Sequence, residues 1–112
     1  YLNMQIKTIT SPWFKYFLRF DQVPVLEKVK CPVLAINGEK DLQVPPKENL
    51  SAIELALKKG GNNNFEVKLL PGLNHLFQTS TTGAISEYGK IEETISPLAL
   101  ETMLNWIKKT TE

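Results

Sequence analysis

The chain has 112 residues, of which 42% are hydrophobic and 22% are charged, as in an ordinary globular domain with a core. Thirteen basic and twelve acidic residues leave a formal net charge of +1, so no excess of charge indicates nucleic acid or a membrane surface as a partner. One cysteine excludes an internal disulfide, and with a single histidine it cannot build a cysteine-rich metal site. No apolar run reaches the roughly 20 residues of a membrane-spanning helix.

The first residues, YLNMQIKTITSPWF, contain neither an initiator methionine nor the basic and then apolar layout of a signal peptide. We therefore expect the chain to be cut from a longer protein. Ser11-Pro12 is a typical helix start, and a short aromatic helix is predicted after it, with a further turn at residues 24–30. Its aromatic residues could line an apolar pocket, but such stripes are more often core; they are Trp13, Phe14, Phe17 and Phe20.

Residues 31–36 (CPVLAI) form an apolar run that ends at Asn37-Gly38 and predicts a strand buried on both faces. Cys31 is then an inert packing residue inside that strand. Pro45-Pro46 predicts the start of a helix that ends at Gly60-Gly61, with an apolar face made of Leu50, Ile53 and Leu57.

Residues 65–70 (FEVKLL), stopped by Pro71-Gly72, predict a second strand. The order of strand, helix and strand implies a parallel pair. Two parallel strands that are apolar on both faces are not a finished sheet, so we expect one end of a larger sheet. If the chain is produced alone, its exposed strand edge should cause self-association.

Residues 78–95 are rich in small polar side chains and are predicted to form a long loop, with a turn around residues 88–93. Ser96-Pro97 repeats the helix-start signal. An amphipathic C-terminal helix is predicted after it, because apolar residues recur at helical spacing; they are Leu100, Met103, Leu104 and Ile107.

Two side chains that can carry chemistry follow the two predicted strands. Asp41 lies a few residues after the first strand and His75 a few residues after the second, so parallel strands would bring both to one sheet edge. A carboxylate that accepts the Nδ1 proton of histidine prepares Nε2 to take a proton from a nucleophile. Asp41 and His75 are therefore the candidate acid and base, with Glu39 as the competing carboxylate.

The segment CPVLAINGEKDLQVPP resembles the strand and loop that carry the acid in the α/β-hydrolase superfamily, where an apolar strand runs into G-x-x-D and a V-P pair. The segment VKLLPGLNHLF resembles the histidine strand of the same superfamily. The nearest likeness is to dienelactone-hydrolase-like and prolyl-oligopeptidase-like esterases and peptidases. The resemblance covers residues from about Ser11 to the C-terminal helix and implies that Asp41 and His75 belong to a Ser-His-Asp triad.

The nucleophile of such a triad precedes the acid in the chain, on a G-x-S-x-G turn, and no such motif occurs here. Ser86, in GAISEYG, has the wrong spacing and follows the histidine, so we reject it as the nucleophile. The backbone donors of an oxyanion hole normally lie upstream too. The chain alone is therefore expected to be inactive.

These observations predict an α/β fold, the C-terminal part of a doubly wound, mostly parallel hydrolase sheet with two strands, a crossover helix and a C-terminal helix. The intact protein is expected to cleave a small ester or peptide substrate, without a metal or organic cofactor. A non-catalytic hydrolase-like binding domain and a small autonomous interaction module are the alternatives. The expected parts are a helical lead-in (1–30), a strand-helix-strand unit (31–77), a loop (78–95) and the closing helix (96–112).

Overall fold

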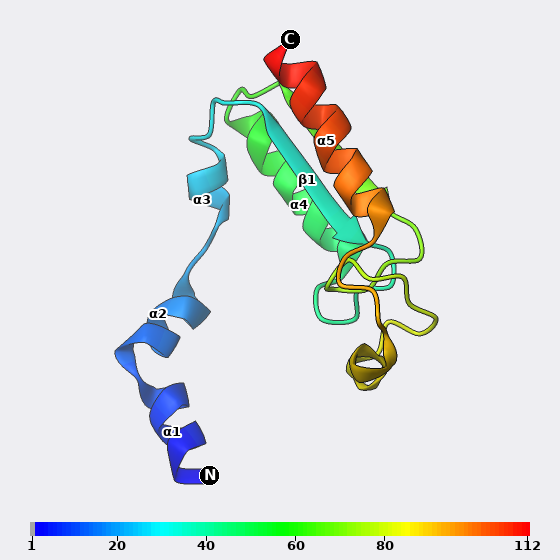
Figure 1. Ribbon diagram of the computed structural model, residues 1–112. Coiled ribbons are helices and arrows are strands. Elements are labelled where there is room, and N and C mark those ends of the chain that lie inside the picture. The colour runs from blue at the N-terminus through cyan, green and yellow to red at the C-terminus, as the bar shows by residue number, and fades with distance from the viewer. Residues whose placement is uncertain (1) are drawn as a thin grey trace.

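The structure, a computed structural model, describes residues 2–112 (Figure 1). Three short helices come first, followed by a strand-helix-strand unit, a 3-10 helix and a long final helix. In chain order the elements are α1 (Leu2–Thr10), α2 (Pro12–Arg19), α3 (Val23–Leu26), β1 (Val33–Gly38), α4 (Pro46–Lys59), β2 (Phe65–Leu70), η1 (Ile85–Lys90) and α5 (Pro97–Thr111).

The sheet consists of β1 and β2, which are parallel as predicted. Their register pairs Val33 with Phe65 at one end and Gly38 with Leu70 at the other. Because the strands are parallel, the loops that follow them leave the sheet at the same edge. This is the arrangement expected for part of an α/β-hydrolase sheet.

Helices α4 and α5 lie on opposite faces of the sheet (Figure 1). Side chains alternate between the two faces of a strand. Asn37 of β1 contacts Asn49 of α4, whereas the neighbouring Ile36 packs against the cluster that contains Leu70 and Ala99 of α5. The part of the chain from β1 to α5 is therefore a three-layer arrangement of helix, sheet and helix.

The predicted start of the first strand was wrong by two residues. Cys31 is exposed and precedes β1, which begins at Val33. Pro32 has no N–H to donate, so the ladder starts only at the next residue, whose N–H donates to the Asn64 carbonyl at 3.1 Å. Cys31 is thus not a core residue.

The prediction that the first strand is buried on both faces was also wrong at the start of β1, and β2 is partly exposed as well. Val33 and Leu34 are only half-buried, and Lys68 and Leu69 of β2 are exposed. The sheet has two strands, so neither has a neighbour on its outer edge within residues 2–112. An apolar groove of about 410 Å³ remains open between the start of β1 and α5, lined by Pro32, Val33, Leu34, Met103, Trp106 and Ile107.

The two helix starts that were predicted at Ser-Pro pairs are confirmed by their caps. The Ser11 hydroxyl accepts a hydrogen bond from the Phe14 N–H, and the Ser96 hydroxyl accepts one from the Leu98 N–H, both at 3.2 Å. Helix α4 starts at Pro46 and ends before Gly60, as the sequence indicates. The loop of residues 78–95 contains η1, slightly earlier than the predicted turn.

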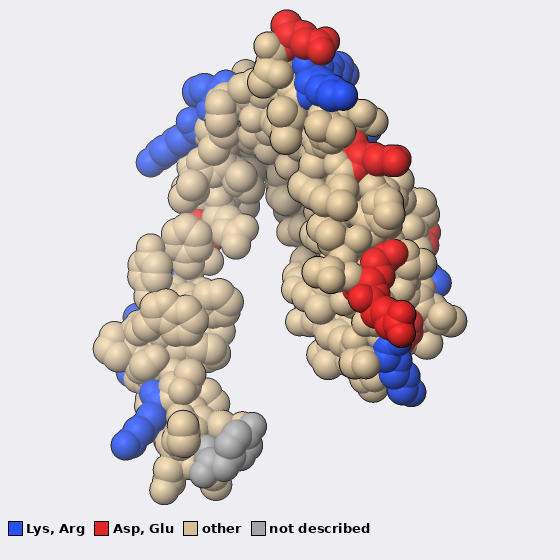
Figure 2. Space-filling model, in the orientation of Figure 1, with Lys and Arg blue, Asp and Glu red and all other residues tan. Residues whose placement is uncertain are grey.

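Residues 2–20 form an arm that extends away from the sheet (Figure 1). Within the expected helical lead-in, α1 is an additional helix that precedes the predicted start at Ser11-Pro12. The aromatic side chains Trp13, Phe17 and Phe20 of the arm are exposed, so they are not core residues of the described chain. Trp13 and Phe17 stack on each other with ring centroids 5.7 Å apart. Few charges cover the arm in Figure 2, so its visible surface is largely uncharged.

None of the helices within residues 2–112 combines the length and the apolar character that a membrane span requires.

Replacement of Leu57 by alanine should lower the free energy of unfolding by about 2 to 5 kcal/mol, because this fully buried side chain (0% exposed) leaves a cavity under α4. Leu55 on the same helix is 67% exposed, and its replacement should cost less than about 0.5 kcal/mol. Urea unfolding followed by circular dichroism measures both. Equal losses in the two variants would contradict this packing.

The open edges of β1 and β2 should cause self-association of the 112-residue chain. Light scattering coupled to size-exclusion chromatography should show a mass that rises with protein concentration. A constant monomer mass over a hundredfold range of concentration would refute this expectation.

Candidate active site

Asp41 is held at the end of β1 by a tight turn. Its N–H donates to the Gly38 carbonyl at 3.2 Å, and its Oδ1 accepts the N–H groups of Gln43 and Val44, both at 2.9 Å. Aspartate is favoured in such turns because its short side chain can accept hydrogen bonds from the following backbone. The residue is only 7% exposed, so its carboxylate has a fixed direction.

His75 lies in the loop after β2, and the neighbouring Asn74 holds that loop in shape. Asn74 is fully buried; its Oδ1 accepts the N–H groups of Leu76 and Gln78, and its amide nitrogen donates to the Gln78 side chain. Phe77 has a φ of 58°, a left-handed conformation that is costly for a bulky residue and that this network maintains. Phe77 packs on the core and anchors the loop, whereas Leu76 is exposed.

The two loops meet over Gly38, the last residue of β1. A Cβ atom at this position would collide with the backbone carbonyl oxygens of Leu73 and Asn74. Only glycine allows the histidine loop to approach β1 this closely. The close approach brings His75 over the Asp41 turn.

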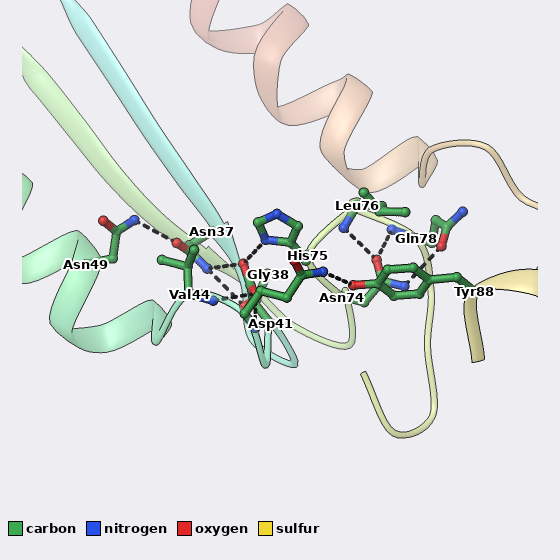
Figure 3. Close-up of polar contacts among 11 residues, drawn as sticks. Asn37, Gly38, Asp41, Val44, Asn49, Asn74, His75, Leu76, Gln78 and Tyr88 are labelled. Atoms are coloured by element: carbon green, nitrogen blue, oxygen red, sulfur yellow. Dashed lines mark hydrogen bonds and ion pairs between the residues drawn. The ribbon is translucent and has the colours of Figure 1, made fainter. Parts of the chain in front are cut away.

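The structure brings Asp41 and His75 into direct contact. The distance between Asp41 Oδ2 and His75 Nδ1 is 2.8 Å, a good hydrogen bond between two residues 34 positions apart (Figure 3). The second ring nitrogen points away from Asp41 in Figure 3, and no residue between 2 and 112 forms a hydrogen bond with it. The His75 side chain is 35% exposed, so Nε2 is available to an incoming group.

Electrostatics keeps Asp41 ionised. Burial alone raises the pKa of the Asp41 carboxyl, because a charged group loses solvation. The hydrogen bond from His75 and those from the Val44 and Gln43 N–H groups act in the opposite direction and outweigh it. The pKa of Asp41 therefore lies below its ordinary value of 3.8, and the residue accepts protons poorly at neutral pH.

The competing carboxylate, Glu39, is bound elsewhere. Its Oε1 accepts a hydrogen bond from the Gly72 N–H at 3.2 Å, and the side chain is exposed. Glu39 therefore links the two loops, whereas Asp41 contacts the imidazole.

Two polar residues near the acid were missed by the sequence analysis. Asn37, regarded only as the end of the first strand, donates from Nδ2 to Asp41 Oδ2 at 3.3 Å. Its Oδ1 accepts a hydrogen bond from Nδ2 of Asn49 at 2.9 Å. The sequence does contain a signal for Asn37, namely a polar residue at the end of an apolar strand. A side chain at this position is buried next to the loop that follows the strand.

The loop of residues 78–95 borders the site through Tyr88, whose hydroxyl accepts a hydrogen bond from the Gln43 amide at 2.7 Å. Glu87 stabilises the loop by accepting the Thr82 hydroxyl and the N–H groups of Thr81 and Thr82. These hydrogen bonds lower the pKa of Glu87 to about 2. The loop thus has its own polar scaffold next to the acid turn.

Neither alternative nucleophile in the described chain is suitably placed. Ser86 lies in the exposed 3-10 helix η1, without a preceding strand to form a strained turn. Cys31 lies before β1, and the six residues of the strand separate it from the Asp41 edge by about 20 Å. Residues 2–112 also contain no cluster of three or more His, Cys, Asp or Glu side chains that could hold a metal ion.

A parallel β-α-β unit with an aspartate and a histidine at the carboxyl edge of its strands is the C-terminal architecture of the α/β-hydrolase superfamily. Residues 6–110 match the prolyl oligopeptidase family, and the chain belongs to this family. Membership places it in a class of hydrolases that includes peptidases. Comparisons with curated proteins and with solved structures gave no significant match.

Replacement of His75 by alanine should raise the pKa of Asp41, because it removes the largest of the interactions that lower it. Carbon-detected NMR titration of the Asp41 carboxyl measures the change. The pKa of Glu87, about 2, depends on other residues and should stay unchanged in the same spectra. An unmoved Asp41 pKa would contradict the contact.

The lowered pKa of Asp41 also predicts how the stability of the fold depends on pH. Folding lowers the pKa of Asp41, so its contribution to stability is complete above 3.8 and is lost as the pH falls through the lower folded value. The Asp41→Asn variant should lack this component. Chemical unfolding at several pH values between about 2 and 6 would test it, and parallel curves for the two proteins would refute it.

Proposed function

We propose that this chain supplies the acid and the base of a Ser-His-Asp triad in a serine hydrolase that cleaves peptide or ester bonds. The serine would come from a segment upstream of Tyr1 in a longer protein. The hydrogen bond of 2.8 Å between Asp41 Oδ2 and His75 Nδ1 is the observation that carries this proposal. Family membership supports hydrolysis as the class of reaction.

His75 would act first as a base and then as an acid. Its Nε2 takes the proton of the serine hydroxyl while the serine oxygen attacks the carbonyl carbon of the substrate. When the tetrahedral intermediate collapses to the acyl-enzyme, the same nitrogen gives the proton to the departing amine or alcohol. Water then attacks the acyl-enzyme with the same assistance, which releases the carboxylic acid and restores the serine.

Asp41 would hold the imidazole in the correct tautomer. With Nδ1 donating to the carboxylate, the lone pair of neutral histidine is on Nε2, where the serine proton must go. The lowered pKa of Asp41 supports this role, because the carboxylate must remain ionised beside the imidazolium that forms.

Peptides are the favoured substrate class, since the family is named for a peptidase. Esters remain the second class because both reactions pass through the same acyl-enzyme.

In the full-length protein, Asp41→Asn should lower kcat on the order of 10⁴-fold while the fold is retained, because the imidazole would be held in the wrong tautomer. His75→Ala should be at least as damaging. Turnover of a p-nitrophenyl ester and of a chromogenic peptide measures the loss, with Glu39→Gln as the matched carboxylate control, which should retain activity. Near-normal turnover of Asp41→Asn would exclude the assignment.

A fluorophosphonate probe separates the proposed enzyme from a non-catalytic hydrolase-like binding domain. The full-length protein should be labelled at a serine upstream of Tyr1, and His75→Ala should slow the labelling strongly because the serine would lose its base. The 112-residue chain alone should not react. Absence of labelling in the folded full-length protein would favour the binding domain.

A further inference from the structure

All four hydrogen-bonding positions of the Asp41 carboxylate are occupied by donors of this chain. A carboxylate accepts about four hydrogen bonds, two on each oxygen. Oδ1 receives the Gln43 and Val44 N–H groups, and Oδ2 receives His75 Nδ1 together with the amide of Asn37. Asn37 is the only one of these donors besides His75 that uses a side chain (Figure 3). It shares the oxygen that holds the imidazole.

The orientation of the Asn37 amide is fixed. Its nitrogen donates to Asp41 Oδ2 and to the Gly38 carbonyl, both at 3.3 Å, and its oxygen accepts the Asn49 amide at 2.9 Å. Reversal of the amide would turn its oxygen toward two acceptors and its nitrogen toward a donor. Asn37 is 4% exposed, so water cannot replace these partners without a rearrangement.

We propose that Asn37 is a positioning residue for the catalytic acid and that Asn49, in the first turn of α4, fixes the Asn37 amide. This inference rests on the proposed function, since it assigns a role in the same proton transfer. Without the Asn37 donor, Oδ2 keeps only its bond to His75 in a buried site. The carboxylate and the imidazole are then free to move together away from the direction that the reaction requires.

The 112-residue chain contains a single histidine, which makes the spectroscopic test direct. The proton on His75 Nδ1 should give one downfield ¹H NMR signal in the wild-type chain, because it is shared with a buried carboxylate. Asn37→Leu keeps the approximate size of the side chain and removes the donor. This variant should shift the signal or broaden it through exchange with water, while circular dichroism shows a folded chain.

In the full-length protein, Asn37→Leu should lower kcat about 10- to 100-fold, the value of a hydrogen bond to a charged group expressed as a rate. KM should change much less, because Asn37 lies behind the acid and does not face the substrate. Asn49→Ala should lower kcat by about two- to tenfold, as expected for a neutral hydrogen bond that acts through Asn37. The Asn49→Ala variant also tests the inference if Asn37→Leu does not fold.

Asn62 provides a matched control, because it is also 4% exposed. Its amide donates to the carbonyls of Val29 and Cys31, near the opposite end of β1. Asn62→Leu should lower stability but leave the His75 signal and kcat unchanged, whereas a purely structural role for Asn37 would make the Asn37 and Asn62 variants alike.

Folded Asn37→Leu with the wild-type His75 signal and kcat would overturn the inference, while loss of activity in His75→Ala would still uphold the proposed function. Conversely, a displaced signal in Asn37→Leu together with no turnover by the wild-type full-length protein would reject the function and with it the catalytic role of Asn37. The two failures are thus distinguishable.

Discussion

The parallel pairing of β1 and β2 is the constraint on which the site depends. Its register aligns Gly38 with Leu70, so the strands end together and their loops leave the sheet side by side. The Glu39 N–H donates to the Leu70 carbonyl and the Lys40 N–H to the Leu73 carbonyl, which continues the pairing into the loops. Asp41 and His75, which are 34 positions apart in sequence, thereby become neighbours that can form a hydrogen bond.

The buried carboxylate of Asp41 would destabilise the fold if it had no partners, because desolvation of a charge is expensive. Backbone N–H groups on one oxygen and side-chain donors on the other offset that cost. The same bonds that make the charge tolerable also define its direction. Stability and the geometry of the pair formed by Asp41 and His75 therefore depend on one set of interactions.

Much of the fold and the placement of Asp41 and His75 could be predicted from the sequence, because the sequence patterns that indicate them are local. Strand β2 and helix α4 have the predicted bounds, since Pro71-Gly72 stops the strand and proline and glycine pairs mark both ends of the helix. The placement of Asp41 and His75 followed from chain direction alone, because parallel strands end at a common edge. Their roles in catalysis stay a prediction.

The failures have physical causes as well. The apolar faces of the arm and of α5 carry a helical pattern, but a pattern does not state what covers it, and here Trp13 and Leu104 remain exposed. The apolar pattern places Cys31 in the strand, but it does not show that Pro32 lacks the N–H that a strand residue donates to the ladder. The Asn37 amide is held by Asn49, twelve residues away, and a contact between two side chains has no signature in local periodicity.

Gly38 gives the two loops their spacing by having no side chain. Any larger residue would meet the carbonyl oxygens of Leu73 and Asn74, which are backbone atoms that cannot swing aside as a flexible side chain would. The pair of strands could tolerate such a residue by lifting the histidine loop, because the ladder below it would remain intact. A protein with a larger residue at position 38 would therefore keep its sheet while Asp41 and His75 move apart. Its fold would look intact although the hydrogen bond between the two residues is broken.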